Sequence, residues 1–195
     1  MLPREFIAQH KQRRITDAIA ELTAECGYEA TKIGDIVRRA GVARKTLYDN
    51  FDGKEAVFLA AFDTAAEECL QRVEAACADA GEGWEARVEA ALEAFLGFVG
   101  EKPAQARLCM IEAMSATPAS SQRYEATLQR FVALAGENAP RHEKLPETIE
   151  ETLVGGVAWI VHQKLRRGEA EQAPQLLAEL AEFVLGPYRG AAAAE

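Results

Sequence analysis

Several features are scarce in this sequence of 195 residues, and each scarcity excludes a class of protein. Its 4 cysteines include no CxxC pair and its 3 histidines are scattered, so the spacing of a structural zinc site is missing. The longest apolar run, residues 154–161, includes two glycines and is too short to span a bilayer. No apolar segment of a secretory signal follows the basic residues near the N-terminus. We therefore expect a cytoplasmic protein without a membrane segment or a metal.

Recognisable catalytic groupings are missing as well. The sequence shows no nucleophile paired with a base, no carboxylate pair in an apolar setting and no phosphate-binding loop. Acidic residues are numerous, but they occur at the spacing of solvated helix surfaces. We expect neither an enzyme nor a bound cofactor. Core packing is favoured over a redox-sensing thiol for the four cysteines, Cys26, Cys69, Cys77 and Cys109.

Strand patterns are absent, because no stretch alternates apolar and polar residues. Apolar residues instead recur at helical spacing along the chain, and glycine- and proline-containing breaks separate the helical stretches. Outside residues 31–53, helices are predicted to end near residue 26 and to span about residues 54–78, 84–99, 104–116, 120–136, 147–167 and 173–185. The predicted fold class is all-α.

Residues 31–55 have the pattern of a helix-turn-helix motif. Apolar residues at positions 33, 36, 37 and 40 form the stripe of a short helix, and Thr31 stands where a capping residue is expected. Gly41 suits the tight turn that follows. A second helix over residues 43–51 would bury Leu47 and Phe51 and leave its basic and polar side chains outside. A basic, solvent-facing helix of an ordinary small bundle is the alternative interpretation.

The outward side chains of that second helix have the chemistry of base recognition. Arg and Lys recognise guanine edges in the major groove, and Asn recognises adenine. Lys54 opposes the dipole of the next helix, which suits a helix end resting on a phosphate. The predicted DNA-binding residues are Lys32, Arg44, Lys45, Thr46, Tyr48, Asn50 and Lys54.

Charge is distributed unevenly along the chain, whose formal net charge is −9. Residues 1–54 hold 10 Lys and Arg against 8 Asp and Glu, a net charge of +2, which leaves −11 for residues 55–195. Phosphate should repel the acidic part, so the N-terminal part is expected to face DNA.

The run from about Arg13 to Phe58 resembles the DNA-binding domain of the TetR family of bacterial transcriptional regulators. This resemblance implies a three-helix DNA-binding domain over residues 1–53 and a helical ligand-binding and dimerisation domain over residues 54–195. Ala43 departs from the family, which usually has a capping Ser or Thr there, at a cost of about 1 kcal/mol. Gly34 also departs, standing where many relatives have a polar or basic residue. The matching residues are Ala18, Leu22, Gly27, Tyr28, Thr31, Ile36, Ala40, Gly41, Val42, Thr46, Leu47, Tyr48, Phe51, Lys54 and Glu55.

Gly155 and Gly156 lie inside a predicted helix, at a cost of about 1 kcal/mol each relative to alanine. A close approach across a subunit interface is favoured over a local kink above a crowded core. The reason is that the resemblance implies a four-helix bundle formed by the last two helices of each subunit. The predicted interface residues are Gly155, Gly156, Ile160, Leu176, Leu180 and Phe183.

The resemblance also implies a small-molecule pocket among the middle helices. Taken one by one, the aromatic and Met residues there are typical of core packing, but together they would suit an apolar pocket. The acidic charge of this region disfavours a highly anionic effector, so an apolar or aromatic molecule is expected. The predicted pocket residues are Trp84, Phe95, Phe98, Arg107, Met110, Met114, Phe131, Trp159 and His162.

The sequence therefore predicts a ligand-responsive transcriptional regulator. The resemblance implies a repressor that binds a near-palindromic operator as a homodimer and is released by a small-molecule effector. The alternative is a helical ligand-binding or protein-interaction module without DNA-binding activity.

Overall fold

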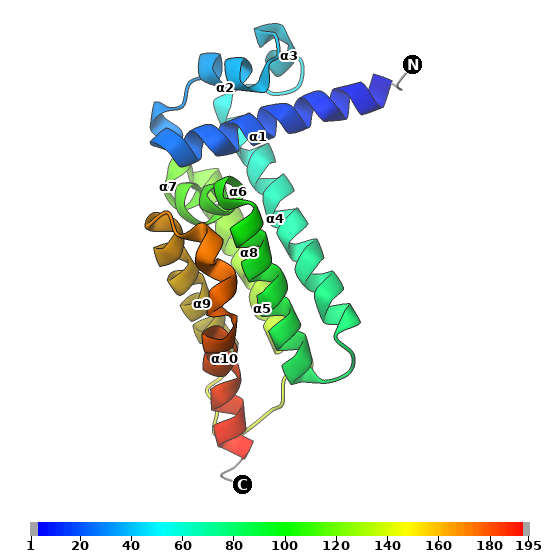
Figure 1. Cartoon of the computed structure of the whole chain (residues 1–195), viewed down its shortest axis with the longest axis vertical. Coiled ribbons are helices and arrows are strands. Elements are labelled where there is room, and N and C mark those ends of the chain that lie inside the picture. The colour runs from blue at the N-terminus through cyan, green and yellow to red at the C-terminus, as the bar shows by residue number, and fades with distance from the viewer. Residues whose placement is uncertain (1–3, 193–195) are drawn as a thin grey trace. The chain divides into compact units, whose positions relative to one another are not determined.

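The structure, a computed structural model, describes residues 4–192, and within that range it consists of helices and connecting turns without a strand (Figure 1). The all-α prediction is confirmed. The longer α-helices are α1 (Arg4–Ala30), α4 (Lys54–Asp79), α5 (Trp84–Glu101), α8 (Pro118–Gly136), α9 (Ile149–Arg166) and α10 (Leu177–Ala192). The shorter elements are α2 (Ile33–Ala40), α3 (Arg44–Tyr48), α6 (Pro103–Arg107), the π-helix η1 (Leu108–Glu112), α7 (Ala113–Ala116) and the 3-10 helix η2 (Ala170–Leu176).

The chain divides into two compact units. The first unit comprises Met1–Ala65 and Ala104–Tyr124, and the second unit comprises Ala66–Pro103 and Glu125–Glu195. The sequence places a domain boundary after residue 53, whereas the first unit continues into α4 and also takes in η1 and α7. Helices α4 and α8 each contribute residues to both units.

The core of the first unit is formed where α1 packs against α2 and where α2 meets α3. Its apolar side chains repeat at helical spacing in the sequence, which places them on the inner faces of their helices. Those that are completely buried include Ile15, Ile19, Ile36, Leu47 and Phe58.

Two glycines shape this unit, because each has a positive φ that other residues rarely adopt. Gly27 (φ 81°) interrupts α1, close to the helix end predicted after Cys26. Gly41 (φ 61°, ψ 40°) ends α2, and its N–H donates to carbonyl groups of the last turn. A Cβ atom at Gly41 would lie 2.5 Å from Nη2 of Arg14.

Thr31 does not have the capping role expected of it. Lys32 occupies the N-cap position of α2, whereas the buried Thr31 hydroxyl donates to the Gly27 carbonyl at 2.8 Å. The interruption at Gly27 leaves that carbonyl needing a partner, and Thr31 supplies it.

In the second unit α5 packs against η2 and α10, and α9 also contacts both of these elements. The sequence predicts that the last helix stops at Gly186 and Pro187, but α10 continues to Ala192. The turn after Pro187 has strong partners: the Tyr188 hydroxyl donates to Glu150 at 2.9 Å, and Arg189 donates to Glu85 at 2.7 Å. These contacts tie the turn after Pro187, a residue that cannot donate a backbone hydrogen bond, to Glu150 and Glu85.

No helix in the described range is long and apolar enough to cross a membrane.

Candidate nucleic-acid interface

Helix α3 exposes a cationic and aromatic face. Leu47 is completely buried, while Arg44, Lys45 and Tyr48 are exposed. The Arg44 guanidinium lies 5.8 Å from the centre of the Tyr48 ring. Ala43 takes the extended conformation of an N-cap residue (φ −71°, ψ 147°), but its side chain has no acceptor for the helix N–H groups.

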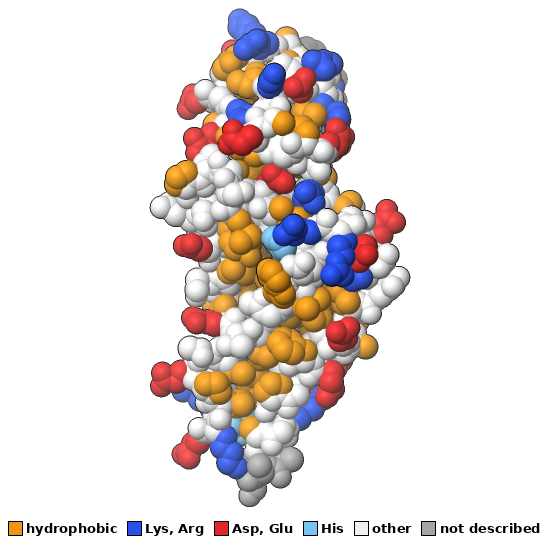
Figure 2. Space-filling view, turned by 90° about the vertical axis from the view of Figure 1, so that its left-hand side faces the viewer, with side chains coloured by type: hydrophobic (Ala, Val, Ile, Leu, Met, Phe, Trp, Pro, Cys, Tyr) orange, Lys and Arg blue, Asp and Glu red, His pale blue; other side chains and the backbone are white. Residues whose placement is uncertain are grey.

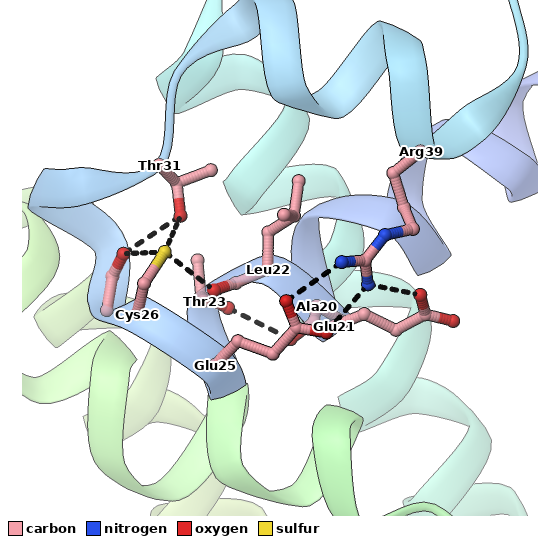
Figure 3. A network of polar contacts seen from close by, with 9 residues as sticks. Ala20, Glu21, Leu22, Thr23, Glu25, Cys26, Thr31 and Arg39 are labelled. Atoms are coloured by element: carbon pink, nitrogen blue, oxygen red, sulfur yellow. Dashed lines mark hydrogen bonds and ion pairs between the residues drawn. The ribbon is translucent and has the colours of Figure 1, made fainter.

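Helix α1 holds the helix-turn-helix through two arginines. Arg14 donates to the Gly41 carbonyl at 3.2 Å, in the turn between α2 and α3. Arg39 of α2 donates to Glu21 and Glu25 of α1 at 2.9 and 2.8 Å (Figure 3). The hydrogen bond from Arg39 lowers the pKa of Glu25. Both guanidinium groups are therefore engaged within the protein.

Asn50 and Lys54, predicted to contact DNA, have partners within the first unit. The Asn50 amide accepts from Gln12 at 3.1 Å and donates to the Thr46 carbonyl at 2.6 Å. The Lys54 ammonium donates to the Tyr28 carbonyl at 3.0 Å and lies 4.0 Å from the centre of the Tyr28 ring. Sequence patterns gave no signal of the contacts to Gln12 and Tyr28, since these partners are far apart in the chain.

The other predicted DNA-binding residues have varied surroundings. Lys32, which directly precedes α2, is exposed. On α3, three members of the set are exposed: Arg44, Lys45 and Tyr48. Thr46 is half-buried. The first unit thus presents four exposed side chains of the predicted set, three of which are cationic.

The residues predicted to line a pocket are divided between the two units. Arg107, Met110 and Met114 belong to the first unit, and the other six belong to the second unit. Met110 is buried, whereas Met114 is exposed. Arg107 lies 3.8 Å from the Glu112 carboxylate.

Within the second unit the predicted pocket residues form pairs. Phe95 and Phe131 meet edge to face with ring centres 5.8 Å apart. Trp159 stacks on His162 at 5.8 Å, but 61% of its surface is exposed. The remaining two residues contact side chains outside the set: Trp84 packs on Tyr188, and Phe98 lies beneath Arg72.

The predicted interface residues lie on α9, η2 and α10, where hydrophobic side chains gather on the surface (Figure 2). Ile160 and Phe183 are exposed, as is the neighbouring Trp159. Leu180 is 2% exposed and therefore belongs to the core, and Leu176 is half-buried.

The two adjacent glycines of α9 differ in their surroundings. A Cβ atom at Gly156 would lie 2.8 Å from the Phe183 ring of the same chain, whereas open space surrounds Gly155. The close approach at Gly156 therefore occurs between α9 and α10 of one subunit.

A short exposed helix joined to α2 by a tight turn and held against α1 defines a helix-turn-helix DNA-binding domain. Residues 15–61 match the family model of bacterial regulatory proteins of the tetR family. The chain matches this family over its helix-turn-helix segment. Because the family consists of transcriptional regulators, the prediction that the chain is not an enzyme is confirmed.

One curated relative is the fatty acid metabolism regulator protein of Bacillus subtilis (strain 168), which is 34% identical over 64 residues. The match spans a third of each chain, 33% in both cases.

Solved structures resemble nearly the whole chain. The fatty acid degradation regulator FadR from Bacillus halodurans has a TM-score of 0.79 and 17% identity, over 90% of this chain and 95% of that one. FadR from Bacillus subtilis in complex with stearoyl-CoA has a TM-score of 0.72 and 18% identity, over 88% and 96%. A TetR-like regulator from Rhodococcus sp. RHA1 has a TM-score of 0.73 and 24% identity, over 93% and 96%. At these identities the likeness establishes the fold.

Proposed function

We propose that the protein is a ligand-responsive transcriptional repressor that acts in the cytoplasm and binds a near-palindromic operator as a homodimer. The observation that carries this proposal is the exposed face of α3, where Arg44, Lys45 and Tyr48 project from a helix that α1 holds in place. A dimer would insert two such helices into successive major grooves, about one helical turn apart.

Within this interface Arg44 and Lys45 recognise base edges, and Lys32, Thr46 and Tyr48 contact the DNA backbone. Arg and Lys on a recognition helix most often recognise guanine. Backbone contacts set the orientation of the protein on the duplex but carry no sequence information directly. Asn50 and Lys54 support this surface from within, since their polar groups already have protein partners.

A second copy of the chain covers the apolar face of α9 and α10. Trp159, Ile160 and Phe183 are large hydrophobic residues left in solvent there. Contiguous exposed apolar surface is typical of protein interfaces, and a two-fold dimer buries the same patch on both subunits. Phe183 would pack on Gly156 of its own subunit and present its outer edge to the partner.

The effector has a substantial apolar part, and a long-chain acyl group is the class that the relatives' names favour. Two of them are regulators of fatty acid metabolism or degradation, and the Bacillus subtilis FadR structure contains stearoyl-CoA. The aromatic pair Phe95 and Phe131 in the second unit has the character of an apolar binding wall. Binding must favour a state with lower operator affinity, and a coupling of about 1–3 kcal/mol is typical.

Gel shifts with the DNA upstream of the protein's own gene test the proposal. Selective binding over random DNA is expected, together with a steep loss of affinity as salt rises. Stearoyl-CoA should release the complex, while free CoA at the same concentration should not. Equal affinity for both DNAs would favour a helical ligand-binding or interaction module instead.

A further inference from the structure

The peptide groups on either side of Tyr28 are held by two oppositely charged side chains. The N–H of Tyr28 donates to Oε2 of Glu112 at 3.0 Å, across 84 residues of sequence. The carbonyl of Tyr28 accepts from the Lys54 ammonium at 3.0 Å. All three residues belong to the first unit, so the contact joins the end of α1 to the start of α4 and to η1.

The Glu112 contact is a strong one by its chemistry. The side chain of Glu112 is 13% exposed, and its Oε1 lies 3.8 Å from a guanidinium nitrogen of Arg107. Tyr28 is itself buried, and its ring packs edge to face on Phe58 at 4.9 Å. Hydrogen bonds to a charged acceptor are shorter and stronger than neutral ones, and burial makes their loss costly.

Two departures from α-helical geometry make the contact possible. Gly27 has φ 81° and ψ 163°, which takes the Tyr28 N–H out of the regular hydrogen bonding of α1. Glu112 is the last residue of the π-helical turn, whose extra residue rotates the following side chains relative to an α-helix. Such turns are rare and often mark functional sites.

We propose that Glu112 is a positioning residue that sets the recognition helix through the Tyr28 N–H. From Tyr28 the connection continues along α1, which reaches the α2–α3 turn through Arg14 and the end of α3 through Gln12. A displacement of η1 by about 1 Å would stretch this 3.0 Å hydrogen bond beyond its useful range, so the bond favours movement of the end of α1 together with η1.

This inference rests on the proposed function and adds a route for its regulation. Arg107, Met110 and Met114, three of the predicted effector contacts, lie on the same continuous stretch of helix as Glu112. An effector that shifts this stretch would change the position of α3 without contacting α1, α2 or α3.

The test compares Glu112→Ala with Glu112→Gln, whose amide oxygen still accepts the Tyr28 N–H. Glu29→Ala is the matched control, because it removes an exposed carboxylate next to Tyr28. We expect Glu112→Ala to weaken binding to the upstream DNA about tenfold, with affinity for random DNA and the salt slope unchanged. Binding by Glu112→Gln and Glu29→Ala should stay within about threefold of the unsubstituted protein.

Hydrogen exchange of the Tyr28 amide is a second readout that needs neither DNA nor an effector. Exchange should be about tenfold faster in Glu112→Ala than in the other three proteins. Equal exchange in all four, or equal losses on upstream and random DNA, would overturn the positioning role. If Glu112→Ala fails to fold, the Gln variant decides: retained amide protection with retained operator affinity supports the role, and loss of either overturns it. A wild-type protein without operator preference refutes the proposed function, while the exchange measurement still reports on the Glu112 contact.

Discussion

The exposed side chains of α3 are Arg44, Lys45 and Tyr48, whereas the large hydrophobic side chains exposed on α9 and α10 are Trp159, Ile160 and Phe183. The cations of α3 are well solvated, so their surface is stable until an anionic partner arrives. Exposing the apolar side chains to water costs a free energy of about 25 cal/mol for each Å² of apolar surface. One surface can therefore bind and release its partner, while the other favours permanent cover.

Phe183→Asp would place a charge in the apolar surface of α9 and α10, and it should have the largest effect. An unpaired charge in a desolvated seam costs several kcal/mol, so sedimentation should show monomers. Operator affinity should fall steeply as well, because a dimer holds its second half-site at about millimolar effective concentration. Leu180→Asp should instead unfold the second unit, since Leu180 is 2% exposed. An intact Phe183→Asp dimer would place the interface elsewhere.

Arg44→Ala and Lys45→Ala would each remove one positive charge from the exposed surface of α3. Each should cost about 1–3 kcal/mol on the operator and relax preference at one position in each half-site. Binding to a panel of singly substituted operators would measure this. Lys32→Ala should instead lower the slope of log K against log salt by about 1 per subunit. Equal weakening on operator and random DNA would show that Arg44 and Lys45 do not recognise bases.

Ala43→Ser would stabilise α3 without changing the charge of its exposed surface. The backbone of Ala43 is already that of an N-cap residue, so a serine hydroxyl should accept a hydrogen bond from the first turn of α3. Thermal unfolding should report a gain of about 1 kcal/mol. Ala43→Val, which lacks the hydroxyl, serves as the control and should give no gain.

The thiols of the two units should differ as well, with the smallest effect on function. Cys26 is exposed in the first unit, whereas burial raises the pKa of Cys69 in the second unit to about 12. At pH 8 iodoacetamide should alkylate Cys26 readily and reach Cys69 only after unfolding, because the thiolate is the reactive form. Mass spectrometry of the labelled peptides reads out both sites. Rapid labelling of Cys69 in the folded protein would contradict its burial.

Local spacing was enough to predict the helix-turn-helix. Leu47 is buried and Lys45 exposed because the two residues lie on nearly opposite faces of one helix. The contacts of Asn50 with Gln12, of Lys54 with Tyr28 and of Tyr28 with Glu112 could not be predicted, since each joins distant parts of the chain and no residue type signals the pairing. Trp159 illustrates the same limit in the second unit: its spacing suits a buried face, yet it lies outside.

The extra residue in η1 also makes the winding of this segment as important as its composition. Wound as a regular α-helix, the same residues Leu108–Glu112 would rotate the helix beyond them by about 100° relative to the part before them. Every side chain of the segment would be unchanged, and Glu112 would still lose its alignment with the end of α1. The number of residues in one turn of the helix thus decides whether the carboxylate meets the Tyr28 N–H.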